Sequence, residues 1–175
     1  YASFVRMYYQ KTFDGILATP LSTEEVIIAE IVWAASKATA AAAIMLMVLG
    51  GFGFIQLPQG LLILPIAFLG GLAFGSAGMF FTGIIPTIDM FNLPIFLFIT
   101  PMFLFSGTFF PVSNLPQWAQ PFAMAFPLHH LVELFRTVGT GTHETPTWIS
   151  LVYLPLFLLL FAFLALVMMK RRLVR

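Results

Sequence analysis

Cysteine and charge are both scarce in this sequence. The chain of 175 residues contains no cysteine, which excludes disulfide bonds, thiolate metal ligands and cysteine nucleophiles. Only 9% of its residues are charged, against about 25% in soluble domains. In contrast, 60% are hydrophobic and the mean hydropathy is +0.98. A chain of this length could not bury this much apolar surface in water. The composition therefore indicates an integral membrane protein.

Several functional signatures are missing as well. The net charge is +1 and no basic patch is large enough for nucleic acid, so the bilayer is expected as a partner and nucleic acid is not. The phosphate-binding pattern G-x-x-x-x-G-K-[ST] does not occur, and the chain therefore does not bind ATP through that motif. Ser76 and Ser106 lie in apolar runs without a nearby His or Asp in sequence. The sequence therefore indicates no catalytic residues.

Four long apolar segments predict an all-α membrane protein with about four transmembrane helices, because a span needs roughly 20 apolar residues. The predicted spans are 26–54, 61–85, 93–110 and 148–169. Pro94 and Pro101 lie in the third span, where we expect a kink. In the second span Gly71 and Gly75 have the small-xxx-small spacing that lets helices approach closely. Ordinary packing inside one bundle is the favoured reading of that spacing.

The remaining segments are more polar. Residues 1–25 mix charged and aromatic residues and are expected to lie along the membrane surface, and Ser22 or Thr23 followed by Glu24 and Glu25 signals a helix start. Residues 111–147 are interrupted by prolines and are expected to form two short amphipathic helices, at about 117–126 and 128–138. Residues 170–175 form a basic tail.

The basic residues predict the orientation. The two ends of the chain carry most of them, and the 111–147 segment carries one, Arg136. By the positive-inside rule both ends are cytoplasmic and residues 111–147 lie outside. We therefore expect a multi-pass protein of the cell (inner) membrane. The basic residues at the ends are Arg6, Lys11, Lys170, Arg171, Arg172 and Arg175.

Two polar groupings are candidate sites. His129, Glu133 and Arg136 are spaced to share one helical face with His130 nearby, and two His with a carboxylate can bind zinc. Adjacent histidines, however, point about 100° apart on a helix, and H-E-x-x-H is absent. A hydrogen-bonded surface on an external re-entrant helix is therefore favoured, with no metal. A membrane-embedded metal-dependent enzyme using His129, His130 and Glu133 remains the alternative.

Glu30 and Lys37, two turns apart in the first span, are the second grouping. Ionisable residues in a membrane helix are functional candidates by default, and they leave an ion-coupled secondary carrier open. Lys37 can also extend to the headgroup layer while Glu30 lies in water. The chain shows no inverted repeat and few other buried ionisable groups, which disfavours the carrier.

Three stretches together resemble a known family: residues 8–38 (YYQKTFDGILATPLSTEEVIIAEIVWAASKA), 98–120 (FITPMFLFSGTFFPVSNLPQWAQ) and 126–138 (FPLHHLVELFRTV). In this order they resemble the membrane subunits of type-2 ABC exporters, in the branch of nodulation-factor (lipo-oligosaccharide) exporters and drug-efflux permeases. The resemblance covers nearly the whole chain. It implies a six-span permease of which this chain contains spans three to six, with further sequence before Tyr1.

The resemblance also implies roles. This chain would export an amphipathic or lipid-linked substrate (lipo-oligosaccharide, polysaccharide or hydrophobic drug), and a separate ATP-binding cassette subunit would hold ATP and Mg. A second permease subunit, in a homodimer, would complete the path. The family's coupling segment, which docks on the ATPase, matches Thr12, Asp14, Gly15, Ile16, Leu17, Thr19, Pro20 and Leu21. The family's external re-entrant hairpin, which gates the path, matches Phe110, Pro111, Pro116, Trp118, Pro127, His129, Glu133 and Arg136.

Overall fold

The structure is a computed structural model and describes residues 2–8, 15–16, 18, 20–55, 57–141 and 145–173. Over these ranges the chain is helical and forms no strand, as predicted. The α-helices are α1 (Ala2–Tyr8), α3 (Thr23–Gly51), α4 (Leu57–Gly60), α5 (Ile63–Ile84), α6 (Asn92–Pro94), α7 (Thr100–Phe105), α8 (Gln120–Met124), α9 (Pro127–Thr140) and α10 (Thr147–Leu173). The same ranges contain the 3-10 helices η1 (Ile88–Phe91) and η3 (Val112–Asn114) and the π-helix η2 (Ile95–Ile99).

Within the described residues, four helical segments are long and apolar enough to cross a membrane, which confirms the predicted number. They are Thr23–Gly51, Ile63–Ile84, Ile88–Phe105 and Thr147–Arg172. The third is the near-continuous run from η1 to α7. It begins five residues before the predicted 93, with η1. It also ends five residues before the predicted 110, because the residues after Phe105 turn away from the helix at Gly107, whose φ is 82°. Such a φ is accessible to glycine and strained for other residues.

Helix α3 begins where the sequence predicts it. The side chain of Ser22 accepts a hydrogen bond from the backbone N–H of Glu25 at 3.3 Å, and the Glu25 carboxylate accepts one from the backbone N–H of Ser22 at 2.7 Å. This capping box satisfies two N–H groups that a helix start would leave without partners. The chain therefore enters its first span at a defined residue.

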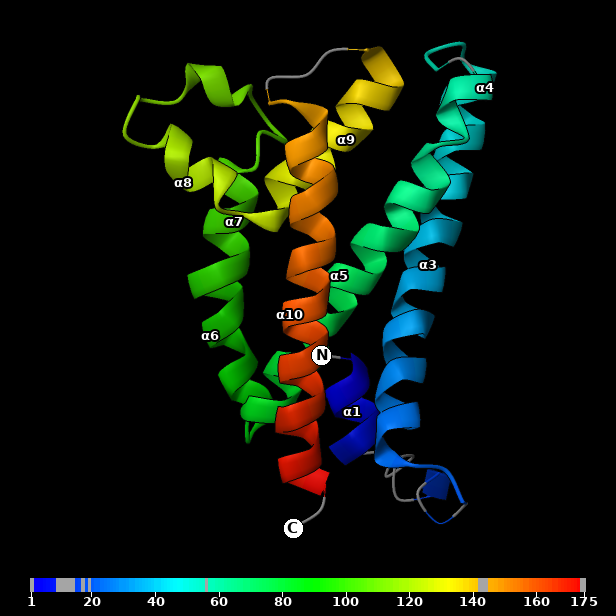
Figure 1. The fold of residues 1–175 in the computed structure, drawn as a ribbon, viewed down its shortest axis with the longest axis vertical. Helices are drawn as coiled ribbons and strands as arrows, with labels where there is room; N and C mark the ends of the chain where they lie inside the picture. The colour runs from blue at the N-terminus through cyan, green and yellow to red at the C-terminus, as the bar shows by residue number, and fades with distance from the viewer. Residues whose placement is uncertain are drawn as a thin grey trace.

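Helix α5 lies at the centre of the bundle and packs against both α3 and α10 (Figure 1). Its buried face is made of small residues, including Ala67, Ala73 and Ala77, which allow close approach of neighbouring backbones. A Cβ added at Gly71 would lie 2.6 Å from the Cα of Ala35 on α3. The Gly71–Gly75 spacing thus serves packing inside this bundle.

The third span is irregular at its prolines, where a kink was predicted. Pro101 has no N–H to donate to the preceding turn. The turn before it widens to the π-helix η2, in which the backbone N–H of Thr100 bonds to the carbonyl oxygen of Ile95. The Thr100 hydroxyl donates to the same oxygen at 2.9 Å. A side-chain hydroxyl therefore supports the helix at the point where proline interrupts its hydrogen bonding.

The polar segments gather at opposite ends of the bundle. Figure 1 places α1 and the C-terminal end of α10 toward one end, and α8 and α9 at the other. A buried apolar cluster joins the elements at the first end: Phe4, Met7, Val26, Ile27, Ile31, Met79, Ile85, Phe91, Ala165 and Met169. The basic residues Arg6 and Arg172 thus lie toward the same end, and Arg136 on α9 lies at the far end.

Candidate functional site

The predicted coupling segment is only partly described. Thr12, Asp14, Leu17 and Thr19 lie outside the described residues. Gly15 and Ile16 have helical backbone, and Gly15, Pro20 and Leu21 are exposed, Leu21 by 48%. The described part thus presents an apolar side chain just before the start of α3.

Ile16, another residue of the predicted coupling segment, contacts the chain's own helices. Its side chain is half-buried and packs against the apolar cluster at the first end of the bundle. That cluster contains residues of α1, α3, α5 and α10. Ile16 therefore fastens the segment to the ends of three long helices, while Leu21 remains available for an external contact.

The predicted hairpin lies at the opposite end and consists of η3, α8 and α9 in sequence. Phe110 is half-buried, Pro111 and Pro116 are exposed, and Trp118 is 70% exposed. Pro127 is the first residue of α9, a position where its missing N–H costs nothing. The expected helices 117–126 and 128–138 are observed as the shorter α8 and the longer α9.

Glu133 is the centre of a buried polar network on α9. It is 2% exposed, and its Oε1 pairs with Nη1 of Arg136 at 3.0 Å. The backbone N–H of Thr145 donates to Glu133 Oε2 at 3.2 Å, and Arg136 Nη2 donates to the carbonyl oxygen of Gly107 at 2.9 Å. The ion pair therefore ties α9 to the end of the third span and to the start of the fourth.

His130 forms a second link, to α10. Its Nδ1 lies 3.0 Å from the Ser150 hydroxyl and its Nε2 lies 2.9 Å from the carbonyl oxygen of Met124. Its ring stacks on Tyr153 with centroids 4.1 Å apart. Burial lowers the pKa of His130; the Met124 carbonyl opposes this, while neighbouring His129 adds to it and Glu133 opposes it. His130 is therefore held neutral near pH 7 as a packing and hydrogen-bonding group.

The same contacts argue against a metal centre at the hairpin. Both ring nitrogens of His130 are occupied by protein partners, and Glu133 is occupied by Arg136 and Thr145. Within the described part of the chain, no group of three His, Asp or Glu side chains is arranged to hold a metal ion. His129, also buried, adjoins His130 with ring centroids 5.3 Å apart.

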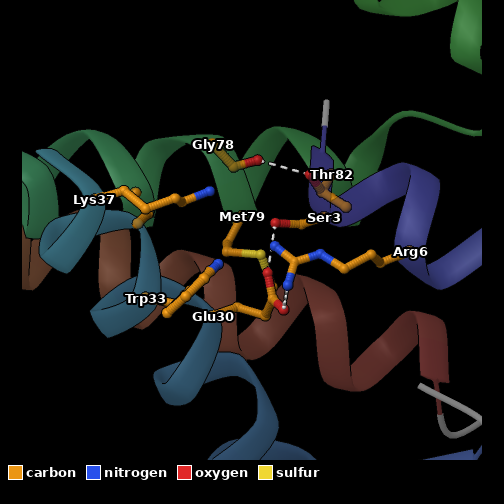
Figure 2. A pocket seen from close by; sticks show the side chains of 10 residues that line it. Ser3, Arg6, Glu30, Trp33, Lys37, Gly78, Met79 and Thr82 are labelled. Atoms are coloured by element: carbon orange, nitrogen blue, oxygen red, sulfur yellow. Dashed lines mark hydrogen bonds and ion pairs between the residues drawn. The ribbon is translucent and has the colours of Figure 1, made fainter. Parts of the chain in front are cut away.

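A polar pocket between α1, α3 and α5 was missed by the sequence reasoning. Figure 2 shows Arg6 reaching from α1 to Glu30 on α3, with Nη1 2.8 Å from Oε1. Ser3 donates to the other carboxylate oxygen of Glu30 at 2.9 Å. Trp33, Lys37, Gly78 and Thr82 also line the pocket. The sequence grouped Glu30 with Lys37, but no local pattern indicates that α1 folds back against them.

These features define an α-helical membrane protein with four candidate spans, whose polar groups gather toward the two ends of the bundle and in one pocket between α1, α3 and α5. Residues 1–139 match the model of the ABC-2 type transporter family. The chain therefore belongs to the ABC-2 type transporter family, as the resemblance predicted, and it is a transporter membrane component rather than an enzyme.

Individual relatives agree with this assignment. Nodulation protein J of Sinorhizobium fredii is 35% identical over 99% of this chain and 66% of its own length, and nodulation protein J of Rhizobium leguminosarum bv. trifolii is 35% identical over 100% and 67%. The probable multidrug ABC transporter permease YbhR of Escherichia coli K12 is 28% identical over 78% of this chain and 37% of the relative. The chain thus spans about two thirds of the length of the nodulation relatives. No solved structure matches it.

Proposed function

We propose that this chain is the membrane-spanning part of an ATP-driven exporter that moves an amphipathic or lipid-linked substrate out of the cell. The observation that carries the proposal is the family match over residues 1–139, together with relatives named nodulation protein J and probable multidrug ABC transporter permease. The four apolar spans provide the membrane path. Lipo-oligosaccharide, polysaccharide and hydrophobic drug are the substrate classes to test.

The energy source in this proposal is a separate ATP-binding cassette subunit, which holds ATP and Mg. It docks at the bundle end that carries α1 and Arg172, which is the cytoplasmic end by the positive-inside rule. Leu21 is exposed there, and Ile16 packs on the cluster shared by α3, α5 and α10. A push on this segment therefore reaches three spans directly. The coupling requires that nucleotide binding favour one of two arrangements of the spans.

The external network has the complementary role of holding the hairpin against the third and fourth spans. Glu133, Arg136 and His130 bind α9 to Gly107, Thr145 and Ser150. A second copy of the permease faces the first, and the substrate passes between the two copies. In this arrangement opening the external mouth requires movement of α9 together with the spans to which it is bound.

The decisive experiment reconstitutes the full-length permease with its ATPase in proteoliposomes and measures ATP-dependent substrate movement. We expect Leu21→Asp to uncouple ATP hydrolysis from transport because it places a charge in the apolar docking contact. Leu21→Met, which keeps the apolar surface, is the matched control and is expected to behave as wild type. Transport that proceeds equally well without the ATPase, or that is unaffected by Leu21→Asp, would contradict the proposal.

A further inference from the structure

The polar pocket between α1, α3 and α5 is a cavity of about 150 Å³. This is roughly ten times the ~15 Å³ that a single buried water needs. The volume suits one small polar group and is far too small for an oligosaccharide. Figure 2 shows Arg6, Glu30 and Lys37 converging on it from two helices.

The pocket has one positive charge in excess. Glu30 is fully engaged, because Arg6 pairs with one carboxylate oxygen and Ser3 donates to the other. Among the residues that the structure describes, no carboxylate forms an ion pair with Lys37, whose ammonium lies 5.8 Å from the ring centre of Trp33. The pocket therefore lacks a counter-charge for Lys37.

The position of Lys37 makes this excess charge significant. Lys37 stands midway between the two ends of α3, a helix of 29 residues, whereas about 20 residues suffice to cross the hydrocarbon layer. The helix therefore has about nine residues more than the layer requires. Even if all of these lay outside the layer at the Thr23 end, Lys37 would still lie within the apolar layer. A charged group at such depth is costly, which makes it a candidate for ligand binding.

The available hydrogen-bond donors define the kind of ligand. Lys37 offers three N–H donors, and the guanidinium of Arg6 has more donors than the one that Glu30 accepts from. Together they match the oxygens of a phosphate-type anion, which forms strong charge-assisted hydrogen bonds with such groups. A cation would meet no free carboxylate oxygen here.

The surroundings of the pocket indicate how the ligand is attached. Trp33 lines the pocket and is 54% exposed, and tryptophan favours the boundary between headgroups and acyl chains. On the membrane-centre side of the pocket, the surface of α3 presents exposed apolar side chains, including Ile44, Met45 and Val48. An anionic group in the pocket would thus have its acyl chains beside apolar protein surface.

We propose that this pocket binds the phosphate-type anionic head group of a membrane amphiphile, with Lys37 and Arg6 as the binding cations. The proposal rests on the proposed function for the side of the membrane, where it places the ligand in the cytoplasmic leaflet. It also narrows the substrate class of that function to amphiphiles that carry an anionic group.

The test uses the full-length permease in a background where Trp33 is the only tryptophan. The protein is placed in phosphatidylcholine vesicles, and brominated phosphatidylglycerol or brominated phosphatidylcholine is added to quench the fluorescence of Trp33. We expect the anionic lipid to quench at about tenfold lower mole fraction than the zwitterionic lipid, as one strong ionic contact would produce. Lys37→Gln should remove this preference. Lys170→Gln, which removes the same charge from the exposed pair with Glu24, should retain it.

A second variant tests the site without altering any charge. A Cβ added at Gly78 meets nothing within 4 Å, so Gly78→Leu can extend its side chain into the pocket. We expect it to reduce the preference for phosphatidylglycerol as Lys37→Gln does. Equal quenching by both lipids in the wild-type protein, or a preference that survives both variants, would overturn the proposal. Protection of Trp33 by free inorganic phosphate in the absence of any lipid preference would also overturn it, because the ligand would then be a soluble anion.

This assay contains no ATPase, so its result is separate from that of the exporter proposal. Anionic lipid preference without ATP-coupled transport would leave the site standing and reject the exporter function. ATP-coupled transport in a protein that shows no lipid preference would support the exporter function and reject the anionic site.

Discussion

The guanidinium of Arg172, in the last turn of α10, donates a hydrogen bond to the carbonyl oxygen of Ile85 at 2.6 Å. Ile85 caps the C-terminal end of α5, and Arg172 also donates to the carbonyl oxygen of Thr82. The last carbonyl groups of a helix lack partners within the helix and carry partial negative charge. Arg172 thus caps the C-terminus of α5 and fixes the ends of two spans to each other.

Replacing Arg172 should destabilise the bundle at this end. We expect Arg172→Gln to lower the free energy of unfolding by about 1–2 kcal/mol, because a charged donor to two helix-terminal carbonyls is lost and the group is only partly buried. Arg172→Lys keeps the positive charge but loses the planar set of guanidinium donors, so its free energy of unfolding should lie between those of the wild type and Arg172→Gln. Thermal unfolding of the purified protein in detergent measures the effect. Arg171→Gln, at an exposed neighbour, should change little; an equal loss there would show that only net charge matters.

The Glu133–Arg136 pair should be strongly coupled. Glu133→Gln leaves Arg136 without its carboxylate in a largely buried setting, and we expect a loss of about 3 kcal/mol. The double variant Glu133→Gln/Arg136→Met removes both charges and should recover part of that loss. A double-mutant cycle on unfolding midpoints, combined with proteolysis of the hairpin, gives the interaction energy. Additive effects of the two substitutions would show that the pair does not hold α9 in place.

Acidification should loosen the hairpin through His130. Burial lowers the pKa of this residue below its ordinary value of 6.5, with His129 adding to the decrease and Met124 and Glu133 opposing it. The unfolded chain therefore binds the proton more readily than the folded one. The stabilising effect of neutral His130 is complete above about pH 6.5, the pKa of the unfolded chain. It is lost as the pH falls from that value toward the lowered pKa of the folded protein, and below that pKa it no longer changes with pH.

Hydrogen exchange of residues 127–140 tests this expectation. Exchange, corrected for its intrinsic pH dependence, should rise as the pH falls below about 6.5. His130→Gln, which cannot be protonated, should abolish the rise while affecting stability at neutral pH through the contacts with Ser150 and Tyr153. The same rise in His130→Gln would assign it to another group.

Local signals in the sequence predicted much of the fold. The apolar runs gave the four spans, and Ser22 with Glu25 gave the start of α3 to within one residue. Pro94 and Pro101 predicted a kink in the third span, and the structure shows a π-helix between them. Each of these depends on residues a few positions apart, whose chemistry acts on their own segment.

Contacts between distant segments could not be predicted in this way. Arg6 and Glu30 pair across different helices, and Arg172 contacts α5 from the far end of the chain. The sequence suggested a shared face for His129, Glu133 and Arg136, but gave no indication that Gly107 and Ser150 complete the network. Ile16 illustrates the same limit, since amphipathicity cannot tell a partner-facing side chain from one that packs on its own bundle.

Two glycines on α5 provide a matched pair for testing helix packing. A Cβ at Gly71 would lie 2.6 Å from the backbone Cα of Ala35, so the α3–α5 pair must separate to accept Gly71→Ala. We expect this variant to lose about 1–3 kcal/mol of stability, as overpacking typically does. A Cβ at Gly78 meets nothing within 4 Å. Gly78→Ala should therefore be neutral or stabilising by up to about 1 kcal/mol, because alanine favours the helix over glycine.

Unfolding midpoints of the two alanine variants in the same detergent decide the matter. The two substitutions are chemically identical and lie on one helix, so differences in propensity and hydrophobicity cancel between them. A lower midpoint for Gly71→Ala alone would show that the close approach of α3 and α5 requires glycine at that position. Equal midpoints would mean that the two helices can move apart at little cost, and the small residues of α5 would then permit sliding of the spans rather than fixing their distance.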